Sequence, residues 1–259
     1  MKRKIYDSMQ KWKEENGRTA LLIDGARRVG KSYIAQEFAK KEYKSYILID
    51  FNRAPAEITD LFVHYLNDLN MFFLYLSNFY GVKLYERESL IIFDEVQLFP
   101  KARAAIKYLV EDGRYDYVET GSLMTIKKNV ADIVIPSEER HMKMYPLDFE
   151  EFLWAKGYSE AHIKDMLKHM KTGIPFSETE MSVYKKLFLE YCVLGGMPAV
   201  VNLYIETNTF SGTLELQKQI QLDYEEDIRK YAEGLDQTKI VSVYRNVPVQ
   251  LAKENKKFQ

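Results

Sequence analysis

The sequence is poor in the features that mark specialised protein classes. It contains a single cysteine, Cys192, among 259 residues, so no internal disulfide can form, which fits a reducing compartment. Its formal net charge is −1, and it therefore lacks the basic excess of dedicated nucleic-acid-binding proteins. With 46% hydrophobic and 29% charged residues, the composition is that of a globular chain with an ample core.

No apolar run is both long enough and free enough of polar groups to cross a membrane. The most apolar window, residues 61–80, contains His64, Asp68 and three asparagines, which are costly in the centre of a bilayer. We interpret this window as two buried helical segments that meet near residues 67–70. The basic N-terminus lacks the apolar core of a secretory signal, so we predict a cytoplasmic protein without membrane contact.

Strand and helix patterns alternate along the first 147 residues. Short apolar runs predict strands, and amphipathic or alanine-rich segments between several of them predict helices. This alternation is typical of a parallel sheet covered by helices on both faces. Helical patterns dominate from about residue 148, so we predict a domain boundary near residues 146–150. The five predicted strands cover residues 19–24, 43–51, 89–97, 115–122 and 140–147.

The segment GARRVGKS, residues 25–32, has the spacing G-x-x-x-x-G-K-S between a predicted strand and a predicted helix. This context is the one in which the pattern forms a phosphate-binding loop. Its two glycines permit a path with inward-pointing N–H groups, and the helix N-terminus favours anions. The lysine reaches the β- and γ-phosphates, and the serine hydroxyl ligates Mg²⁺. The predicted nucleotide-binding residues are Gly25, Ala26, Arg27, Arg28, Val29, Gly30, Lys31, Ser32 and Tyr33.

Two acidic residues, Asp94 and Glu95, follow the apolar run of the third predicted strand. Ligand sites in parallel sheets lie at the carboxyl ends of the strands, so we expect Asp94 to face the phosphate loop. Its predicted role is to hold Mg²⁺ through the water shell of the ion, while Glu95 orients or deprotonates an attacking water. Gln97 is a further candidate for contact with that water. The alternative is a solvated, negatively charged strand end.

Three more residues are candidates for catalysis. Thr120 and Ser122 end the fourth predicted strand, where a hydroxyl can contact the γ-phosphate or the water, and the sequence does not choose between them. Ordinary turn chemistry is the alternative for both. Arg140 is a candidate for stabilising charge on the γ-phosphate of its own chain or of a neighbouring chain. The competing interpretation of Arg140 is a solvated side chain beside two glutamates.

The four histidines carry no metal-binding signature. The sequence has no H-E-x-x-H pattern and no cysteine cluster for zinc. His162 and His169 lie seven residues apart on one face of a predicted helix. We interpret them as surface or hydrogen-bonded histidines rather than as a metal site.

Five segments occur in an order typical of one family: LLIDGARRVGKS, LIIFDEVQ, VETGSL, YPLDFEEFL and LGGMPAVV. Over nearly its whole length the chain resembles the prokaryotic AAA-type ATPases that are related to archaeal ATPases and carry an uncharacterised C-terminal domain. The resemblance implies an α/β P-loop NTPase with a parallel, AAA+-like five-stranded sheet of order 5-1-4-3-2 and a mainly helical region after it. It implies the following residues: Walker A at Gly25, Gly30, Lys31 and Ser32, Walker B at Asp94 and Glu95, the sensor at Thr120 or Ser122, and the arginine at Arg140.

The resemblance also implies a division into domains. The ATPase core covers residues 1–147 and a lid-like helical region covers residues 148–234. Residues 235–259 begin a winged-helix-like C-terminal module, which family members usually continue into a restriction-nuclease-like fold. Because family members are usually longer, we expect this chain to be truncated there.

The favoured function is Mg²⁺-dependent hydrolysis of ATP that couples the nucleotide state to conformation, with weak activity expected of a truncated chain. ATP is favoured over GTP because the sequence has no N-K-x-D segment. The alternative is a nucleotide-gated switch with negligible turnover that binds DNA or a protein through its helical and C-terminal regions. A kinase is disfavoured because no arginine-rich lid is visible. Assembly into a homo-oligomer agrees with the resemblance, since an arginine acting in trans needs a neighbouring subunit.

Overall fold

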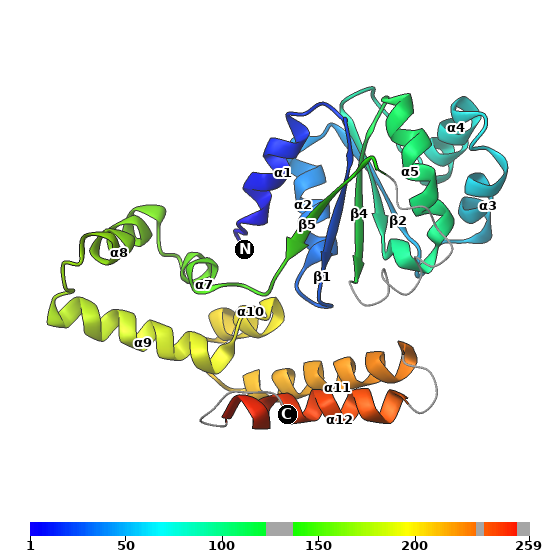
Figure 1. The fold of residues 1–259 in the computed structure, drawn as a ribbon. Coiled ribbons are helices and arrows are strands. Elements are labelled where there is room, and N and C mark those ends of the chain that lie inside the picture. Colours follow the sequence, from blue (N-terminus) through cyan, green and yellow to red (C-terminus); the bar gives the residue numbers. More distant parts are fainter. Residues whose placement is uncertain (123–136, 232–235, 253–259) are drawn as a thin grey trace. The chain divides into compact units, whose positions relative to one another are not determined.

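A parallel five-stranded sheet forms the centre of the N-terminal part of the chain in the computed structural model, which describes residues 1–122, 137–231 and 236–252 (Figure 1). The strand order is β2-β3-β4-β1-β5, and every neighbouring pair is parallel. Read from the other edge, this is the predicted order 5-1-4-3-2, which is thereby confirmed. The strands are β1 (Ala20–Gly25), β2 (Ser45–Asp50), β3 (Ser89–Asp94), β4 (Asp116–Ser122) and β5 (Glu139–Met144).

Helices cover both faces of the sheet, as the runs of consecutive apolar residues in β1 and β3 predict. On one face, α1 (Ile5–Lys13) and α2 (Lys31–Glu42) bury Trp12 and Phe38 against alternate strand residues such as Leu21 (Figure 1). On the other face, α3 (Ala56–His64), α4 (Leu69–Tyr80) and α5 (Pro100–Asp112) build an aromatic core around Phe62 and Phe93. A short 3₁₀ turn, η1 (Val96–Leu98), follows β3.

The apolar window 61–80 contains a helix break, as predicted. Helix α3 ends at His64 and α4 begins at Leu69. Asp68 caps α4, because its side chain accepts a hydrogen bond from the backbone N–H of Met71 over 3.2 Å. Among the helices that the structure describes, none has the length and apolar character needed to cross a membrane.

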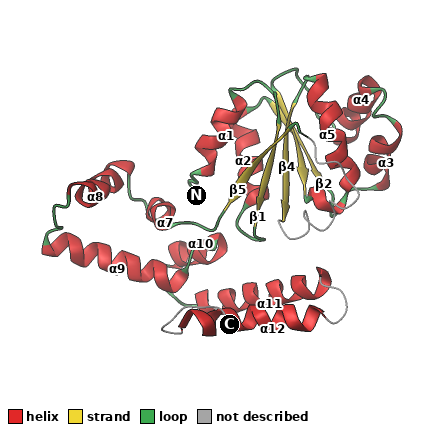
Figure 2. Cartoon of the chain, in the orientation of Figure 1, coloured by secondary structure: helices red, strands yellow, loops and turns green. Residues whose placement is uncertain are grey.

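The chain beyond β5 is mainly helical, as predicted (Figure 2). Two compact units can be distinguished, Met1–Pro198 and Ala199–Gln259. The predicted boundaries after residues 147 and 234 stay a prediction. After β5 the described residues form the helices α7 (Phe149–Ala155), α8 (Glu160–Thr172), α9 (Glu178–Leu194), α10 (Pro198–Thr207), α11 (Thr213–Tyr231) and α12 (Asp236–Ala252).

The strand register places the ends of β1, β3 and β4 at one edge of the sheet. Gly25, the last residue of β1, is paired with Ser122, the last residue of β4. On the far side of β3, Asp94 is paired with Asp50, the last residue of β2. All strand carboxyl ends therefore share an edge, which is where parallel sheets place ligand sites.

A buried ionic cluster lies beneath α5, on the sheet face opposite α1 and α2. Arg103 makes two parallel hydrogen bonds of 2.7 Å to the carboxylate of Glu139, and both side chains are almost fully buried. Glu119 of β4 is fully buried beside them. Burial raises the pKa of Glu119 well above its ordinary value, the neighbouring Glu139 raises it further, and Arg103 opposes the rise.

Candidate functional site

The loop between β1 and α2 depends on glycine at two positions. Gly25 has a φ of 156°, and a Cβ atom added to it would lie 2.2 Å from the carbonyl oxygen of Met144 in β5. Gly30 has a φ of 96° and directly precedes the first residue of α2. A larger residue at either position is strained. The glycine spacing seen in the sequence therefore fits the path of this backbone.

The residues between these two glycines differ in exposure. Ala26, Arg27 and Arg28 are exposed, whereas Val29 is fully buried. Arg28 has a φ of 65°, an unusual conformation for a residue with a side chain. Tyr33, the last predicted nucleotide-binding residue, is 56% exposed on the first turn of α2. The loop thus presents backbone and basic side chains to solvent and anchors itself through Val29.

Lys31 lies at the N-terminus of α2 with its ammonium folded over the loop. Its Nζ donates hydrogen bonds to the carbonyl oxygens of Ala26 (2.8 Å) and Gly25 (3.2 Å). Burial lowers the pKa of Lys31, and the carboxylates of Glu95 and Asp94 act in the opposite direction. The ammonium therefore lies within the electrostatic field of the acidic pair, at a helix end that favours anions.

Two hydroxyl groups converge on one oxygen of Asp94. Ser32 Oγ donates a hydrogen bond to Asp94 Oδ1 over 2.6 Å, and the buried Thr120 Oγ1 donates to the same oxygen. These side chains come from α2, β3 and β4. A serine hydroxyl beside a carboxylate at the strand ends is a set of hard oxygen donors, which fits Mg²⁺.

Glu95 has a strained backbone directly after β3. Its φ is 54° and its ψ is 44°, a left-handed conformation that costs about 1 kcal/mol for a residue with a Cβ atom. Its backbone N–H donates to Thr120 Oγ1 over 3.4 Å, and Gln97 Nε2 donates to its side-chain Oε2. The strain and the contacts together fix where the carboxylate lies, as is common at functional sites.

The structure brings Ser122 to the site but not Arg140. Ser122 is buried at the end of β4, in register with Gly25. Arg140 is paired with Leu21 near the opposite end of β1, and it is exposed and forms an ion pair with Glu15. Met144, the partner of Gly25, lies four positions further along β5, which is about 13 Å of extended chain. Arg140 therefore lies away from Gly25 along the sheet, and its role at the γ-phosphate of its own chain or of a neighbouring chain stays a prediction.

Two residues near the loop were not found by sequence reasoning. Asp24 is the second-last residue of β1, directly before Gly25; it is 6% exposed, and its Oδ1 has no hydrogen-bond partner among the described residues. The signal was an acidic residue inside an otherwise apolar strand. Arg3 is buried and donates a hydrogen bond to the carbonyl oxygen of Val29 over 2.9 Å. The N-terminal basic run gave no sign that one of its members is buried.

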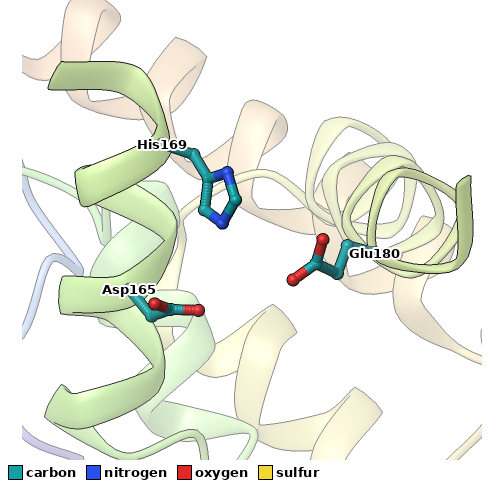
Figure 3. A group of neighbouring side chains, drawn as sticks. All are labelled: Asp165, His169 and Glu180. Carbon is teal, nitrogen blue, oxygen red and sulfur yellow. The ribbon is translucent and has the colours of Figure 1, made fainter. Parts of the chain in front are cut away.

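A separate group of side chains with metal-ligating atoms lies on α8 and α9. Asp165, His169 and Glu180 point toward a common space, with one ligand atom of each within 4.8 Å of the others (Figure 3). Glu180 is held by the capping box of α9, where its Oε2 accepts hydrogen bonds from the backbone N–H and hydroxyl of Ser177. His169 Nδ1 lies 3.1 Å from the carbonyl oxygen of Ile174. These local contacts explain the orientation of Glu180 and His169.

Two family models match the chain. One, described as an AAA domain, matches residues 17–153, which is just over half of the chain. The other, described as a domain of unknown function, matches residues 185–259. An uncharacterized protein of Methanocaldococcus jannaschii is 21% identical over 217 residues. That alignment covers 71% of this chain and 44% of the relative, so the chain spans less than half the length of that protein.

Two archaeal proteins are among the solved structures that match the chain. A Walker-type ATPase of Pyrococcus abyssi is 16% identical with a TM-score of 0.47, and the match covers 96% of this chain and 77% of that one. The ORC1 protein of Aeropyrum pernix, solved in complex with DNA, is 11% identical with a TM-score of 0.43. That match covers 98% of this chain and 80% of the other.

Proposed function

The chain belongs to the AAA domain family, and from this premise we propose that it binds ATP with Mg²⁺ and hydrolyses ATP to ADP and phosphate. The observation that carries the proposal is the convergence of a glycine-bounded loop, Lys31, Ser32 and Asp94 at one edge of the sheet. A triphosphate needs such a combination of N–H groups, one ammonium and a metal-holding oxygen pair.

Binding of the triphosphate requires Lys31 to exchange partners. Its ammonium donates to two loop carbonyls, and phosphate oxygens offer it stronger, charge-assisted hydrogen bonds. Ser32 and Asp94 would hold Mg²⁺, the serine directly and the aspartate through the water shell of the ion. When bound, Mg²⁺ supplies charge neutralisation between the β- and γ-phosphates. The predicted phosphate contacts of Arg27 and Arg28 fit their exposure on the loop.

Glu95 is the residue that we assign to the attacking water. Its carboxylate accepts a proton from, or orients, the water that attacks the γ-phosphorus in line with the departing ADP oxygen. Gln97 and Thr120 support this assignment, because they hold the side chain and the backbone N–H of Glu95. Thr120 and Ser122 stay the two candidates for sensing the γ-phosphate. Thr120 is engaged with Asp94, and for it we propose the orientation of that carboxylate.

Two substitutions and one control test the proposal. Lys31→Ala should lose nucleotide affinity, because the ammonium that pairs with the phosphates is gone, whereas Glu95→Gln should bind ATP but fail to turn it over. Lys40→Ala, an exposed lysine on the same helix, is the matched control. Binding is measured with a fluorescent ATP analogue and turnover by phosphate release. Undiminished ATP binding by Lys31→Ala would refute the phosphate-loop assignment.

The same assay separates hydrolysis from a switch that only binds. Wild-type protein that binds ATP but releases no phosphate above the level of Glu95→Gln would be a nucleotide-gated switch. Adding DNA of mixed sequence to the assay tests whether a nucleic-acid partner stimulates turnover. Because the chain spans only part of its M. jannaschii relative, the partner and any homo-oligomer belong to the proposal as well.

A further inference from the structure

Arg3 joins three segments of the chain that are far apart in sequence. It lies just before α1 and is 6% exposed. Its Nη1 donates to the carbonyl oxygen of Val29 (2.9 Å), and its Nη2 donates to the carbonyl oxygen of Tyr145 (2.5 Å). Its Nε donates to Glu151 Oε1 (3.2 Å). One guanidinium therefore contacts the phosphate loop, the segment after β5 and the first turn of α7.

The carboxylate that pairs with Arg3 is itself held in place. Glu151 Oε1 also accepts a hydrogen bond from the backbone N–H of Lys4 over 2.7 Å. The other oxygen accepts one from the backbone N–H of Asp148 (3.3 Å), and the side chain of Asp148 caps α7 in return. Because the side chain of Glu151 is only 7% exposed, its charge depends on Arg3 for compensation. The guanidinium thus has a fixed partner on α7.

Two sequence segments that the proposed function does not use pack around the same place. The turn before α10 lies against the segment before α7, because Leu147 N–H donates to the carbonyl oxygen of Gly196 over 2.7 Å. A Cβ atom added to Gly196 would lie 2.1 Å from the carbonyl oxygen of Leu147. Pro198, two residues on, lies 4.0 Å from the Cβ position of Gly30, and so does Arg3 Nη1. The segment before α7 and residues 196–198 therefore meet beside the phosphate loop.

We propose that Arg3 is a positioning residue that fixes the shape of the phosphate loop and couples it to α7. Peptide units are planar, and the carbonyl and the following N–H point in opposite directions. By holding the carbonyl of Val29, Arg3 therefore also fixes the direction of the Gly30 N–H, one of the groups that the loop offers to phosphate. A phosphate that accepts a hydrogen bond from this N–H shifts the same peptide. The shift is transmitted through Arg3 to its contacts with Tyr145 and Glu151.

Arginine is required here because three donors in one rigid plane must reach three acceptors. A lysine offers a single ammonium on a flexible stem and does not reproduce this geometry. Arg3→Lys keeps the charge and removes the planar fork, so it tests the geometry rather than the charge. Arg103→Lys is the matched control, because it makes the same change in another buried arginine–glutamate pair, on the opposite face of the sheet.

The first measurement is amide hydrogen exchange of the full chain without nucleotide. We expect Arg3→Lys to accelerate exchange about tenfold for residues 26–33, while Arg103→Lys leaves those amides unchanged. Glu151→Gln, which keeps an acceptor and removes the charge, should accelerate the same amides to a smaller extent, and it serves as the test if Arg3→Lys does not fold. Equal loop exchange in the wild type, Arg3→Lys and Glu151→Gln would overturn the proposal.

The second measurement adds Mg²⁺ and ATP, and this arm rests on the proposed function. In the wild type we expect nucleotide to slow exchange in residues 26–33 and in residues 145–156. In Arg3→Lys the second response should be lost at saturating nucleotide, and affinity should fall about tenfold. If Arg3→Lys and Glu151→Gln both keep the wild-type response at residues 145–156, the coupling is refuted. Failure of the wild type to bind ATP would instead refute the proposed function, and the nucleotide-free arm would still decide the role of Arg3 in the loop.

Discussion

The hydroxyl of Ser32 donates a hydrogen bond to Asp94 Oδ1 over 2.6 Å, although 62 residues separate the two. Ser32 stands in the first turn of α2 and Asp94 ends β3, so the contact joins the phosphate loop to the acidic pair. Thr120 donates to the same oxygen from β4. This carboxylate oxygen is therefore the point where three elements of the α/β core meet, and the first two predictions concern it.

Asp94→Asn should weaken the dependence of ATP binding on Mg²⁺. A carboxamide keeps the size of the side chain but loses the negative charge that attracts the hydrated ion. We expect the Mg²⁺ concentration that half-saturates binding to rise about 10- to 100-fold, the range typical of lost outer-shell partners. Fluorescent-nucleotide titrations at a series of Mg²⁺ concentrations measure this. Asp50→Asn, at the end of neighbouring β2, is the control, and an unchanged Mg²⁺ requirement in Asp94→Asn would contradict the assignment.

Thr120→Val should reduce turnover more than it reduces nucleotide affinity. The substitution conserves volume but removes the buried hydroxyl that donates to Asp94 and accepts from the N–H of Glu95. An unsatisfied buried polar group costs about 1–3 kcal/mol, so chemical denaturation should show a loss of that order. Phosphate release should fall while ATP binding stays within about threefold, less than 1 kcal/mol. Thr120→Ser keeps a hydroxyl and should retain turnover. Undiminished phosphate release by Thr120→Val would exclude a role for the hydroxyl.

Glu95→Gly should make the protein more stable and inactive. Glu95 has a φ of 54°, and glycine adopts this left-handed conformation without the penalty of about 1 kcal/mol that a Cβ atom brings. The greater freedom of glycine in the unfolded chain offsets part of that gain. We expect the free energy of unfolding to rise by about 0.5 kcal/mol while phosphate release is lost.

Asn16→Gly is the control for the gain in stability and the loss of turnover expected of Glu95→Gly. Asn16 has a φ of 55° and is exposed after α1, so the substitution makes a comparable backbone change away from the site. Its turnover should equal that of the wild type. If Glu95→Gly proves less stable than the wild type by urea denaturation, the backbone at this position is not a source of strain.

Short sequence patterns predicted the features whose geometry depends on neighbouring residues, such as the phosphate loop. The spacing of Gly25, Gly30 and Lys31 predicts the loop, because a turn between a strand and a helix needs those residues at those positions. The strand order follows from the family resemblance and agrees with the sheet. The sequence left open whether Arg140 acts on the nucleotide of its own chain or of a neighbouring chain, because sequence gives no register between β1 and β5. The register decides that it lies near the opposite end of β1 from Gly25.

Burial of charge was the feature that sequence did not reveal. Arg3 belongs to a run of basic residues, a pattern typical of a solvated surface. It is nevertheless only 6% exposed, because it contacts Val29, Tyr145 and Glu151. Glu119 lies in the strand segment VETGS, where the sequence indicates only a polar residue near a turn. The fold buries it beside Arg103 of α5 and Glu139 of β5, two residues from other elements of the chain. Contacts between segments that are far apart in sequence leave no pattern in the neighbouring residues from which they could be predicted.

The buried Glu119 should make the stability of the protein depend on pH. Burial first, and Glu139 second, raise the pKa of Glu119 above its ordinary value of 4.5. The folded state then binds this proton more tightly than the unfolded state does, so the associated stability is fully present below about pH 4.5. It is lost as the pH rises through the raised pKa of the folded state. While Glu119 titrates in the unfolded state only, this loss amounts to about 1.4 kcal/mol per pH unit.

Glu119→Gln removes this dependence because a carboxamide does not ionise. Urea denaturation at pH values from 4 upward should give the variant a flatter profile than the wild type, with the difference growing as pH rises. Glu57→Gln, an exposed glutamate on α3, controls for the loss of one acidic group, so the difference between the two variants isolates the buried position. Parallel profiles for Glu119→Gln and Glu57→Gln would mean that Glu119 is ionised in the folded protein, with Arg103 compensating both carboxylates. In that case the raised pKa of Glu119 would be wrong.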